Sequence, residues 1–356
     1  MMERYCVIMA GGIGSRFWPL STEACPKQFI DILGKGKSFI RATFERFRPL
    51  VPDEHFLVVT NAAYKQQVLQ HLPELSEEQV LCEPMRRNTA TCIAYAAYRI
   101  AEGECHGNRA MVVTPADHYV TDEDAFRAVI ARGFDFVEAH PEALTTIGIC
   151  PTRPETGYGY IEQGAPSGDN AAVWRVAAFK EKPDHAHAMQ FLAAGNYMWN
   201  SGIFLWSVQA YQRALQQYLP AMRTIFRTGD GIWNTPSEQQ WLETHYPQCE
   251  NISVDYGILE KSDSCYMLRG DFGWSDVGTW GSLYEHASKD GSANATAGEA
   301  LLVDSNRCVV NVEPGTQAIV QGLDGYLVAM RGGQLLVCSL REEQHIKDWV
   351  AQLSCR

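Results

Sequence analysis

The sequence has no apolar run long enough to span a membrane and no surplus of positive charge. Its 30 lysines and arginines face 42 aspartates and glutamates, which gives a formal net charge of -12 at pH 7. That balance argues against nonspecific binding to nucleic acid or to an anionic membrane surface. An acidic chain that binds phosphates must therefore gather positive charge locally or obtain it from a metal ion.

The sequence also lacks paired cysteines. Its 11 cysteines include no Cys-x-x-Cys pair, and several of them, such as Cys6, Cys92 and Cys338, lie in apolar runs. We predict buried free thiols in a reducing cytoplasm rather than a disulfide framework or a zinc site. Because the first residues lead directly into an apolar run, we expect no signal peptide.

Short apolar runs alternate with amphipathic stretches through most of the chain. The runs predict strands at 5–10, 56–60, 79–82, 111–114 and 144–149. The amphipathic stretches predict helices at 39–47, 64–72, 91–100, 209–226 and 238–246. This alternation predicts an α/β fold with a doubly wound, mostly parallel sheet. In such sheets, ligands bind at the carboxyl ends of the strands.

The last part of the chain has a different pattern. Residues 289–297 are small and polar and predict a linker, and residues 301–338 are short β-rich runs separated by turn residues. A final helix is predicted at 342–353. We therefore expect two domains, a catalytic one at 1–290 and a small β-rich one with a terminal helix at 296–356.

A glycine-rich stretch follows the first predicted strand, with three glycines in residues 11–14, then Arg16 and later Lys27. Such a turn lets backbone N–H groups approach an anion, and the two cations would neutralise a polyphosphate. A tight structural turn is the alternative. No Gly-Lys-Ser/Thr closes the stretch, which excludes a Walker A loop, and Phe17 stands where a dinucleotide fingerprint needs its third glycine.

Polar residues follow two other predicted strands. Glu83, Asn88 and Thr89 come after the strand ending at 82, and they are explained equally well by a helix cap at Thr89 or by a loop that recognises a nucleotide base. Asp117 follows the strand at 111–114, where a carboxylate is well placed to bind magnesium. One carboxylate is not a metal site, and Asp276, far along the chain, is the candidate second ligand.

Three further stretches contain glycines or polar residues that could bind a ligand. Gly159 lies in a run of glycines and tyrosines that also fits a hairpin turn, and for Glu181 and Lys182 the charge pattern alone favours an exposed strand end. Asn200 belongs to a polar trio inside an apolar run, and such a trio needs hydrogen-bond partners if it is buried.

Several of these motifs together resemble the sugar-1-phosphate nucleotidylyltransferases, and most closely the mannose-1-phosphate guanylyltransferases. The resemblance rests on at least six ordered motifs over nearly the whole chain: Gly11–Ser21, Pro26–Phe29, Glu83–Ala90, Gly157–Ile161, Glu181–Pro183, Trp199–Phe204 and Ser253–Lys261. It implies a Rossmann-like catalytic domain and a small β-helix-like C-terminal domain that helps two copies pair as a homodimer.

The resemblance also implies residue roles. Arg16, Lys27 and Asp117 would be catalytic, and Asp117 and Asp276 would bind Mg2+. The sugar phosphate would meet Gly159, Glu181, Lys182 and Asn200. The nucleotide would meet Ala10, Gly11, Gly12, Gly14, Ser15, Glu83, Asn88 and Thr89. The acidic residues of Ser253–Lys261 are expected to be structural or to contact the residues that bind the substrate.

The implied reaction joins GTP and mannose 1-phosphate to give GDP-mannose and pyrophosphate. The closest alternative is the same chemistry on another base or sugar, and a catalytically silent nucleotide-sugar sensor is an alternative of another class. A hydride-transfer enzyme is disfavoured by the missing third glycine. A bifunctional enzyme is disfavoured because the chain has no room for an added cupin-type isomerase domain.

Overall fold

A computed structural model describes residues 2–102, 108–167 and 170–354. The chain forms two compact units. Unit 1 comprises residues up to Gly11, Phe44–Ala116 and Val120–Trp274. Unit 2 comprises Gly12–Thr43, Asp117–Tyr119 and Ser275–Arg356. The predicted division into domains at 1–290 and 296–356 stays a prediction, because compactness alone does not show which segments fold independently.

Unit 1 is built around one sheet. Its strands are β1 (Glu3–Met9), β2 (Phe56–Asn61), β3 (Val80–Glu83), β4 (Arg109–Pro115), β6 (Leu144–Ile149), β7 (Tyr160–Ser167), β8 (Asn170–Lys180), β9 (Tyr197–Ser207) and β10 (Cys265–Gly270). Its helices are α2 (Lys65–His71), α3 (Asn88–Ala101), α4 (Glu123–Ala139), α5 (His185–Ala194), α6 (Val208–Tyr218), α7 (Pro220–Arg227), α8 (Glu238–His245) and α9 (Val254–Gly257). Helix α1 (Phe39–Phe47) and the paired strands β5 (Tyr119–Val120) and β11 (Trp274–Ser275) each cross a boundary between the units.

The strand order of the sheet is β3-β2-β1-β4-β9-β6-β10-β8-β7. The first four of these pair in parallel, β9 is antiparallel to both β4 and β6, and β8 is antiparallel to β10. Strands β8 and β9 therefore run against the other strands of the sheet. The prediction of an α/β fold with a mostly parallel sheet is confirmed.

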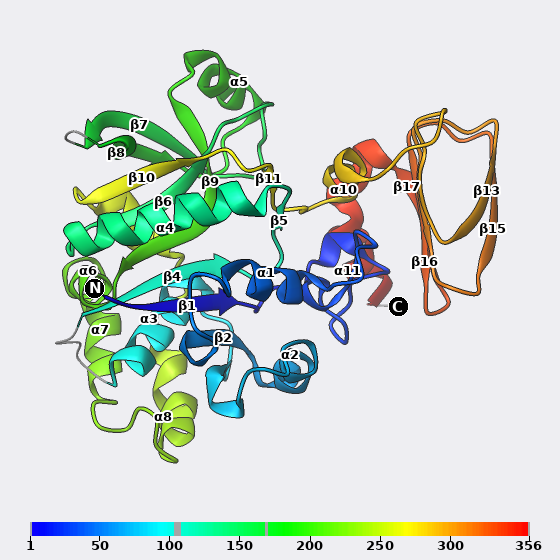
Figure 1. The fold of residues 1–356 in the computed structure, drawn as a ribbon. Coiled ribbons are helices and arrows are strands. Elements are labelled where there is room, and N and C mark those ends of the chain that lie inside the picture. The colour runs from blue at the N-terminus through cyan, green and yellow to red at the C-terminus, as the bar shows by residue number, and fades with distance from the viewer. Residues whose placement is uncertain (1, 103–107, 168–169, 355–356) are drawn as a thin grey trace. The chain divides into compact units, whose positions relative to one another are not determined.

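Helices cover both faces of the sheet, as the alternation of side chains in β9 shows. Phe204 and Trp206 point into the core formed with α3, α6 and α7, and Trp206 stacks on Tyr211 of α6 at 5.3 Å between ring centroids. Leu205 points the other way, against Gly133 of α4, and Figure 1 shows α4 lying across the sheet. This two-sided burial explains why the central strands are continuous apolar runs.

Unit 2 contains α10 (Trp280–His286), the strands β12 (Ala295–Ala297), β13 (Glu299–Val303), β14 (Val309–Val312), β15 (Gln317–Gln321), β16 (Tyr326–Arg331) and β17 (Gln334–Ser339), and helix α11 (Ile346–Ser354). They form a four-stranded sheet β12-β14-β16-β17 and a two-stranded sheet β13-β15. One core of this unit joins residues 17–39 to α10, the four-stranded sheet and α11, through Phe17, Ile30, Trp280 and Ile346 among others.

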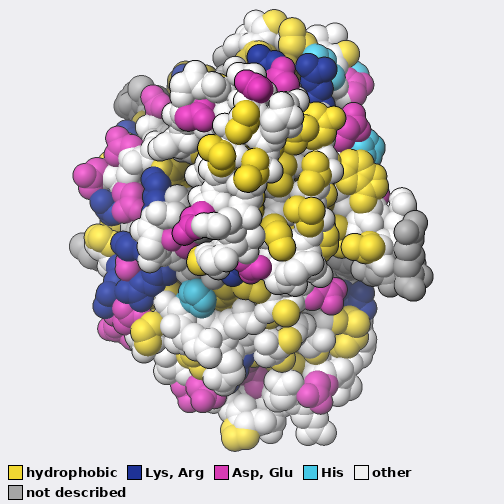
Figure 2. All heavy atoms as spheres, turned by 90° about the vertical axis from the view of Figure 1, so that its right-hand side faces the viewer, with side chains coloured by type: hydrophobic (Ala, Val, Ile, Leu, Met, Phe, Trp, Pro, Cys, Tyr) yellow, Lys and Arg dark blue, Asp and Glu magenta, His cyan; other side chains and the backbone are white. Residues whose placement is uncertain are grey.

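The two small sheets enclose a second core through Val310, Val320 and Val328. Large apolar side chains are nevertheless exposed on their outer sides, at Leu301, Val303, Ile319, Leu335 and Val337. Figure 2 views the molecule from this side and shows apolar side chains gathered there. An exposed apolar surface of this kind is typical of an interaction surface.

Two local predictions from the sequence are wrong in detail. The single helix expected at 209–226 is two helices, because Pro220 lacks the N–H that would continue α6 and instead starts α7. The expected linker at 289–297 is an ordered turn that leads into β12, and in this turn buried Asn294 donates to Asp290 and to the carbonyl of Ser305 and accepts from the N–H of Cys308.

All nine cysteines in the described part of the chain are free thiols, and six of them are buried. Among the described residues, no helix has the length and apolar character needed to cross a membrane.

Candidate active site

Lys27 is the centre of a compact polar cluster in unit 2. Its side chain is only 3% exposed and lies between the rings of Phe17 and Phe39, with Nζ 5.7 and 5.0 Å from their centroids. The ammonium donates to Asp117 Oδ2 and to the Asp117 carbonyl, both at 3.0 Å, and to the Asp276 carbonyl at 2.6 Å. These acceptors use all three of its N–H donors. Lys27 is therefore a fixed internal cation that holds both aspartate segments, rather than a mobile one.

The charge of Lys27 determines the state of Asp117. Burial raises the pKa of Asp117, but the charges of Lys27 and His118 and the hydrogen bond from Lys27 outweigh it, so the pKa lies below its ordinary value. The side chain of Asp117 is still one-third exposed. Asp117 thus presents an ionised carboxylate to solvent at neutral pH, as a magnesium ligand must.

The backbone around Asp276 is unusual. Its Oδ1 accepts from the N–H of Gly278 at 2.8 Å, and between them buried Val277 has a φ of 41°. A β-branched residue in the left-handed region is strained and persists only where its surroundings enforce it. Here the side chain of Val277 is fixed in the core beside Trp280. That anchoring holds the half-buried carboxylate of Asp276 in one position.

The glycine-rich stretch leads directly from β1 into this cluster. Gly14 has a φ of +74°, and a Cβ there would lie 2.5 Å from the Cβ of Lys27, so only glycine fits. Gly12 is exposed with open space around it. Ser15 and Arg16 begin a short 3-10 helix, and Arg16 is exposed and pairs with no other residue that the structure describes. Arg16, unlike Lys27, is available to an anionic ligand.

In unit 1, Glu83 ends β3 as a buried carboxylate. Its Oε1 accepts from the hydroxyl of Tyr246, and its Oε2 lies 3.8 Å from where a Cβ on Gly11 would be. Burial raises the pKa of Glu83 to about 7, although the hydrogen bond from Tyr246 and the charge of Arg86 oppose the shift. Sequence reasoning did not identify Tyr246, because no local motif marks it.

Asn88 and Thr89 lie in the first turn of α3. Thr89 does not cap this helix, because its hydroxyl accepts from the N–H of Val254 at 2.9 Å. Asn88 is exposed with a φ of 62°, and its side-chain oxygen accepts from the N–H of Thr89. The predicted base loop is therefore fastened to the start of α9, and Asn88 remains open to solvent.

The four predicted sugar-binding residues lie together in unit 1. A Cβ on Gly159 would collide with Oε2 of Glu181 and would lie 3.5 Å from the Cβ of Asn200. Lys182, which is 64% exposed, pairs with Oε1 of Glu181 at 2.8 Å. The backbone N–H of Asn200 donates to the carbonyl of Gly159 at 2.8 Å. This group offers a carboxylate, an amide and a cation within one small surface.

Two further residues belong to this group. Asn200 Nδ2 donates to Asp255 Oδ1 at 2.7 Å, and the hydroxyl of Thr146 donates to Asn200 Oδ1 at 3.2 Å. Burial raises the pKa of Asp255 to about 6, with the charge of Glu181 adding to the shift and the bond from Asn200 opposing it. Sequence reasoning treated Asp255 as structural or supporting and did not identify Thr146.

The predicted site residues therefore gather in two groups. Unit 2 brings Lys27, Asp117 and Asp276 together, and Gly12, Gly14, Ser15 and Arg16 belong to the segment that leads to Lys27. Unit 1 holds the other predicted residues: Ala10, Gly11, Glu83, Asn88, Thr89, Gly159, Glu181, Lys182 and Asn200. Among the described residues, no group of three or more His, Cys, Asp or Glu could hold a metal ion. A metal in the first group would depend on two aspartates and on ligands from a substrate.

Comparison with known proteins gives consistent matches. The model of the nucleotidyl transferase family matches residues 5–293. A mannose-1-phosphate guanylyltransferase of Escherichia coli is 34% identical over 97% of this chain and 72% of its own. The alginate biosynthesis protein AlgA of Pseudomonas aeruginosa is 34% identical over 98% of this chain and 72% of its own.

A solved structure from Thermus thermophilus, described as a mannose-1-phosphate geranyltransferase, has a TM-score of 0.85 and 32% identity. The match covers 99% of this chain and all of that one. Sequence and structure therefore agree over nearly the whole length. The chain belongs to the nucleotidyl transferase family of enzymes, among the mannose-1-phosphate guanylyltransferases.

Proposed function

We propose that this enzyme transfers GMP from GTP to mannose 1-phosphate, releasing pyrophosphate and forming GDP-mannose. An oxygen of the sugar phosphate attacks the α-phosphorus of GTP, and the bond from that phosphorus to the bridging oxygen of the β-phosphate breaks. The nucleophile is already ionised at neutral pH, so the reaction needs no general base. Catalysis then consists of alignment and charge neutralisation.

The observation that carries the proposal is the cluster of Lys27, Asp117 and Asp276. Lys27 binds both aspartate segments and keeps the Asp117 carboxylate ionised. Arg16 is exposed in the loop that leads to this cluster, and we assign it to the triphosphate and the departing pyrophosphate.

We further propose that Asp117 and Asp276 hold Mg2+. The donor set fits, since both carboxylates are hard oxygen ligands that are at least partly exposed, and magnesium commonly uses one or two carboxylates plus substrate phosphates. When bound, the ion would offset the negative charge that develops on the reacting phosphates. Lys27 would meanwhile keep the two aspartates at a fixed separation.

The group in unit 1 is assigned to specificity. Glu83, Asn88 and Thr89 would contact the guanine, and Gly159, Glu181, Lys182 and Asn200 would bind the sugar and its phosphate. In support, Glu181, Asn200 and Gly159 are packed together, and Lys182 is an exposed cation beside them.

We also propose a homodimer in the cytoplasm. The exposed apolar side chains on β13, β15 and β17 would suit pairing through the C-terminal sheets. The free thiols suit a reducing compartment.

The test is pyrophosphate release by the purified protein with magnesium, GTP and mannose 1-phosphate. ATP, UTP, CTP and glucose 1-phosphate serve as control substrates, and excess EDTA serves as the metal control. We expect release only with GTP and mannose 1-phosphate, and none in EDTA. Release with another pair would refute the specificity, and release in EDTA would refute the metal assignment. Binding of GDP-mannose without any release would instead favour a nucleotide-sugar sensor.

A further inference from the structure

The hydrogen bonds around Asn200 fix which way its side-chain amide points. The oxygen Oδ1 accepts from the backbone N–H of Gly202 at 3.3 Å and from the hydroxyl of Thr146 at 3.2 Å. A backbone N–H only donates, so the oxygen and not the nitrogen must face Gly202. The nitrogen Nδ2 consequently faces Asp255, whose Oδ1 it meets at 2.7 Å.

This arrangement leaves one N–H group of the amide to bind a ligand. Oδ1 faces Gly202 and Thr146 inside the protein, where the Thr146 hydroxyl shares its one proton between Oδ1 and the carbonyl of Ile203 at 3.3 Å, and one of the two N–H groups of Nδ2 is used by Asp255. The remaining N–H is a donor. The carboxylate of Glu181, packed against Gly159 beside Asn200, is an acceptor. A donor and an acceptor side by side suit two hydroxyl groups of a sugar.

Asp255 is itself held in place from a second direction. It lies in α9, and the N–H of Val254 at the start of that helix donates to the hydroxyl of Thr89 at 2.9 Å. The carbonyl of Ile252 accepts from the N–H of Ala90 at 3.2 Å. Since Thr89 and Ala90 begin α3, the carboxylate of Asp255 is fixed to the main body of unit 1 and not to a free loop.

We propose that Asp255 is a positioning residue that fixes the Asn200 amide as a hydrogen-bond donor to one hydroxyl of the sugar phosphate. The inference rests on the proposed function, because it requires a sugar phosphate to bind beside Asn200 and Glu181. Asp255 acts through Asn200 and does not touch the substrate. It thereby contributes to the choice of sugar without contributing to the choice of base.

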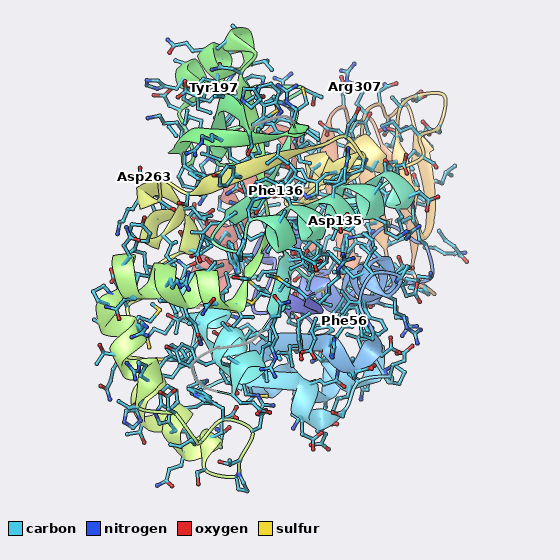
Figure 3. The ribbon with its side chains drawn as sticks, turned by 60° about the vertical axis from the view of Figure 1, so that its left-hand side comes forward. Phe56, Asp135, Phe136, Tyr197, Asp263 and Arg307 are labelled. Carbon is cyan, nitrogen blue, oxygen red and sulfur yellow. The ribbon has the colours of Figure 1, made fainter. Side chains whose placement is uncertain are left out.

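The test compares Asp255→Ala and Asp255→Asn with the wild type in steady-state kinetics. The substrates are mannose 1-phosphate, its 2-, 3-, 4- and 6-deoxy analogues, and GTP. The matched control is Asp263→Asn, which removes the same charge at an exposed turn position before β10, labelled in Figure 3. Thr146→Val provides an independent variant, since it removes the hydroxyl that binds Asn200 Oδ1 and leaves Asp255 intact.

For Asp255→Ala we expect the KM for mannose 1-phosphate to rise about 10-fold or more while the KM for GTP changes less than about twofold. Asp255→Asn should have a smaller effect, because a neutral amide oxygen is a weaker acceptor than a carboxylate. In the wild type, one deoxy analogue should lose about 10-fold in kcat/KM through the missing hydroxyl. That loss should shrink to below about threefold in Asp255→Ala, since the amide nitrogen loses the acceptor that directs its second N–H toward the sugar. Thr146→Val should change the same analogue's penalty in the same direction.

Equal rises in the KM for both substrates, or an unchanged set of deoxy penalties, would overturn the inference and leave Asp255 a structural residue. Loss of the penalty at two hydroxyls would also overturn it, since Asp255 would then contact the sugar directly. A wild-type enzyme inactive with mannose 1-phosphate would count against the proposed function, whereas an active wild type with unaffected variants would count against this inference alone.

Discussion

Replacing Lys27 by methionine tests whether its buried ammonium holds the two aspartate segments together. Methionine has a similar length and an apolar end that fits between the rings of Phe17 and Phe39. The change would remove the ion pair with Asp117 and would leave the carbonyl oxygens of Asp117 and Asp276 without this donor. The packing should therefore survive while the electrostatic contribution is lost.

The expected loss in the free energy of unfolding is about 2–4 kcal/mol. Breaking a fully buried ion pair costs about 3–5 kcal/mol, and an exposed pair contributes at most about 1 kcal/mol. The Lys27–Asp117 pair lies between these limits, because the lysine side chain is 3% exposed and the aspartate side chain 33%. Lys65→Met, which breaks a surface pair with Glu77, is the matched control and should cost less than about 1 kcal/mol.

The assay is urea unfolding followed by the fluorescence of all nine tryptophans, of which Trp18, Trp280 and Trp349 belong to unit 2. A double-mutant cycle with Asp117→Asn isolates the pair. Because the double variant leaves no unpaired charge, we expect it to be at least about 1 kcal/mol more stable than the sum of the single changes predicts. Additive losses, or a Lys27→Met variant within about 1 kcal/mol of the wild type, would refute the reasoning.

Three further predictions concern single substitutions. Asp117→Asn should stay folded but lose about 2–4 kcal/mol in unfolding free energy, because Lys27 stays buried without its charged partner, and it should lose at least about 100-fold in kcat. Near-wild-type turnover at saturating magnesium would contradict the metal assignment. Glu83 has a pKa of about 7 against an ordinary 4.5, so the folded state holds its proton more tightly than the unfolded state does. Its ionisation therefore reduces stability as pH rises from about 4.5 to 7, and Glu83→Gln should be about 2–3 kcal/mol more stable than the wild type at pH 8 but not at pH 4.5. Equal urea midpoints of the two proteins at both pH values would contradict this. Gly159→Ala should raise the KM for mannose 1-phosphate at least about 10-fold by displacing the Glu181 carboxylate, with the KM for GTP unchanged. Parallel rises in both constants would count against it.

The parts of the fold that depend on local sequence were predictable. The bounds of α1 and β6 match the prediction, because α1 has apolar residues at helical spacing and β6, buried on both faces, is a short continuous run. The split at Pro220 was missed by the prediction of one helix at 209–226, although proline removes a backbone donor whatever its surroundings. The strand order could not be predicted from the sequence. Nothing local to residues 197–207 shows that β9 lies between β4 and β6 and runs in the opposite direction.

The site shows the same limit. Sequence motifs pointed to Lys27, Asp117 and Asp276, and the structure brings these three residues together. The state of each group was not predictable, because it depends on contacts between distant segments. Tyr246 meets Glu83 across 163 positions and Asp255 meets Asn200 across 55. Those contacts decide which oxygen of Glu83 is occupied and which acceptor the amide nitrogen of Asn200 meets.

Unit 2 is built from segments that lie far apart in the chain, and this affects how it folds during translation. The ribosome delivers the chain from its N-terminus, so Gly12–Thr43 emerges long before Ser275. Lys27 lies 249 positions before Asp276. Until then, Phe17 and Ile30 lack the part of their core that residues from Val277 onward supply, and nascent chains with exposed apolar side chains are prone to aggregate and to bind chaperones. We therefore expect unit 2 to complete its folding only late in translation, after the residues that follow Ser275 have been synthesised and can pack against the segment that carries Lys27.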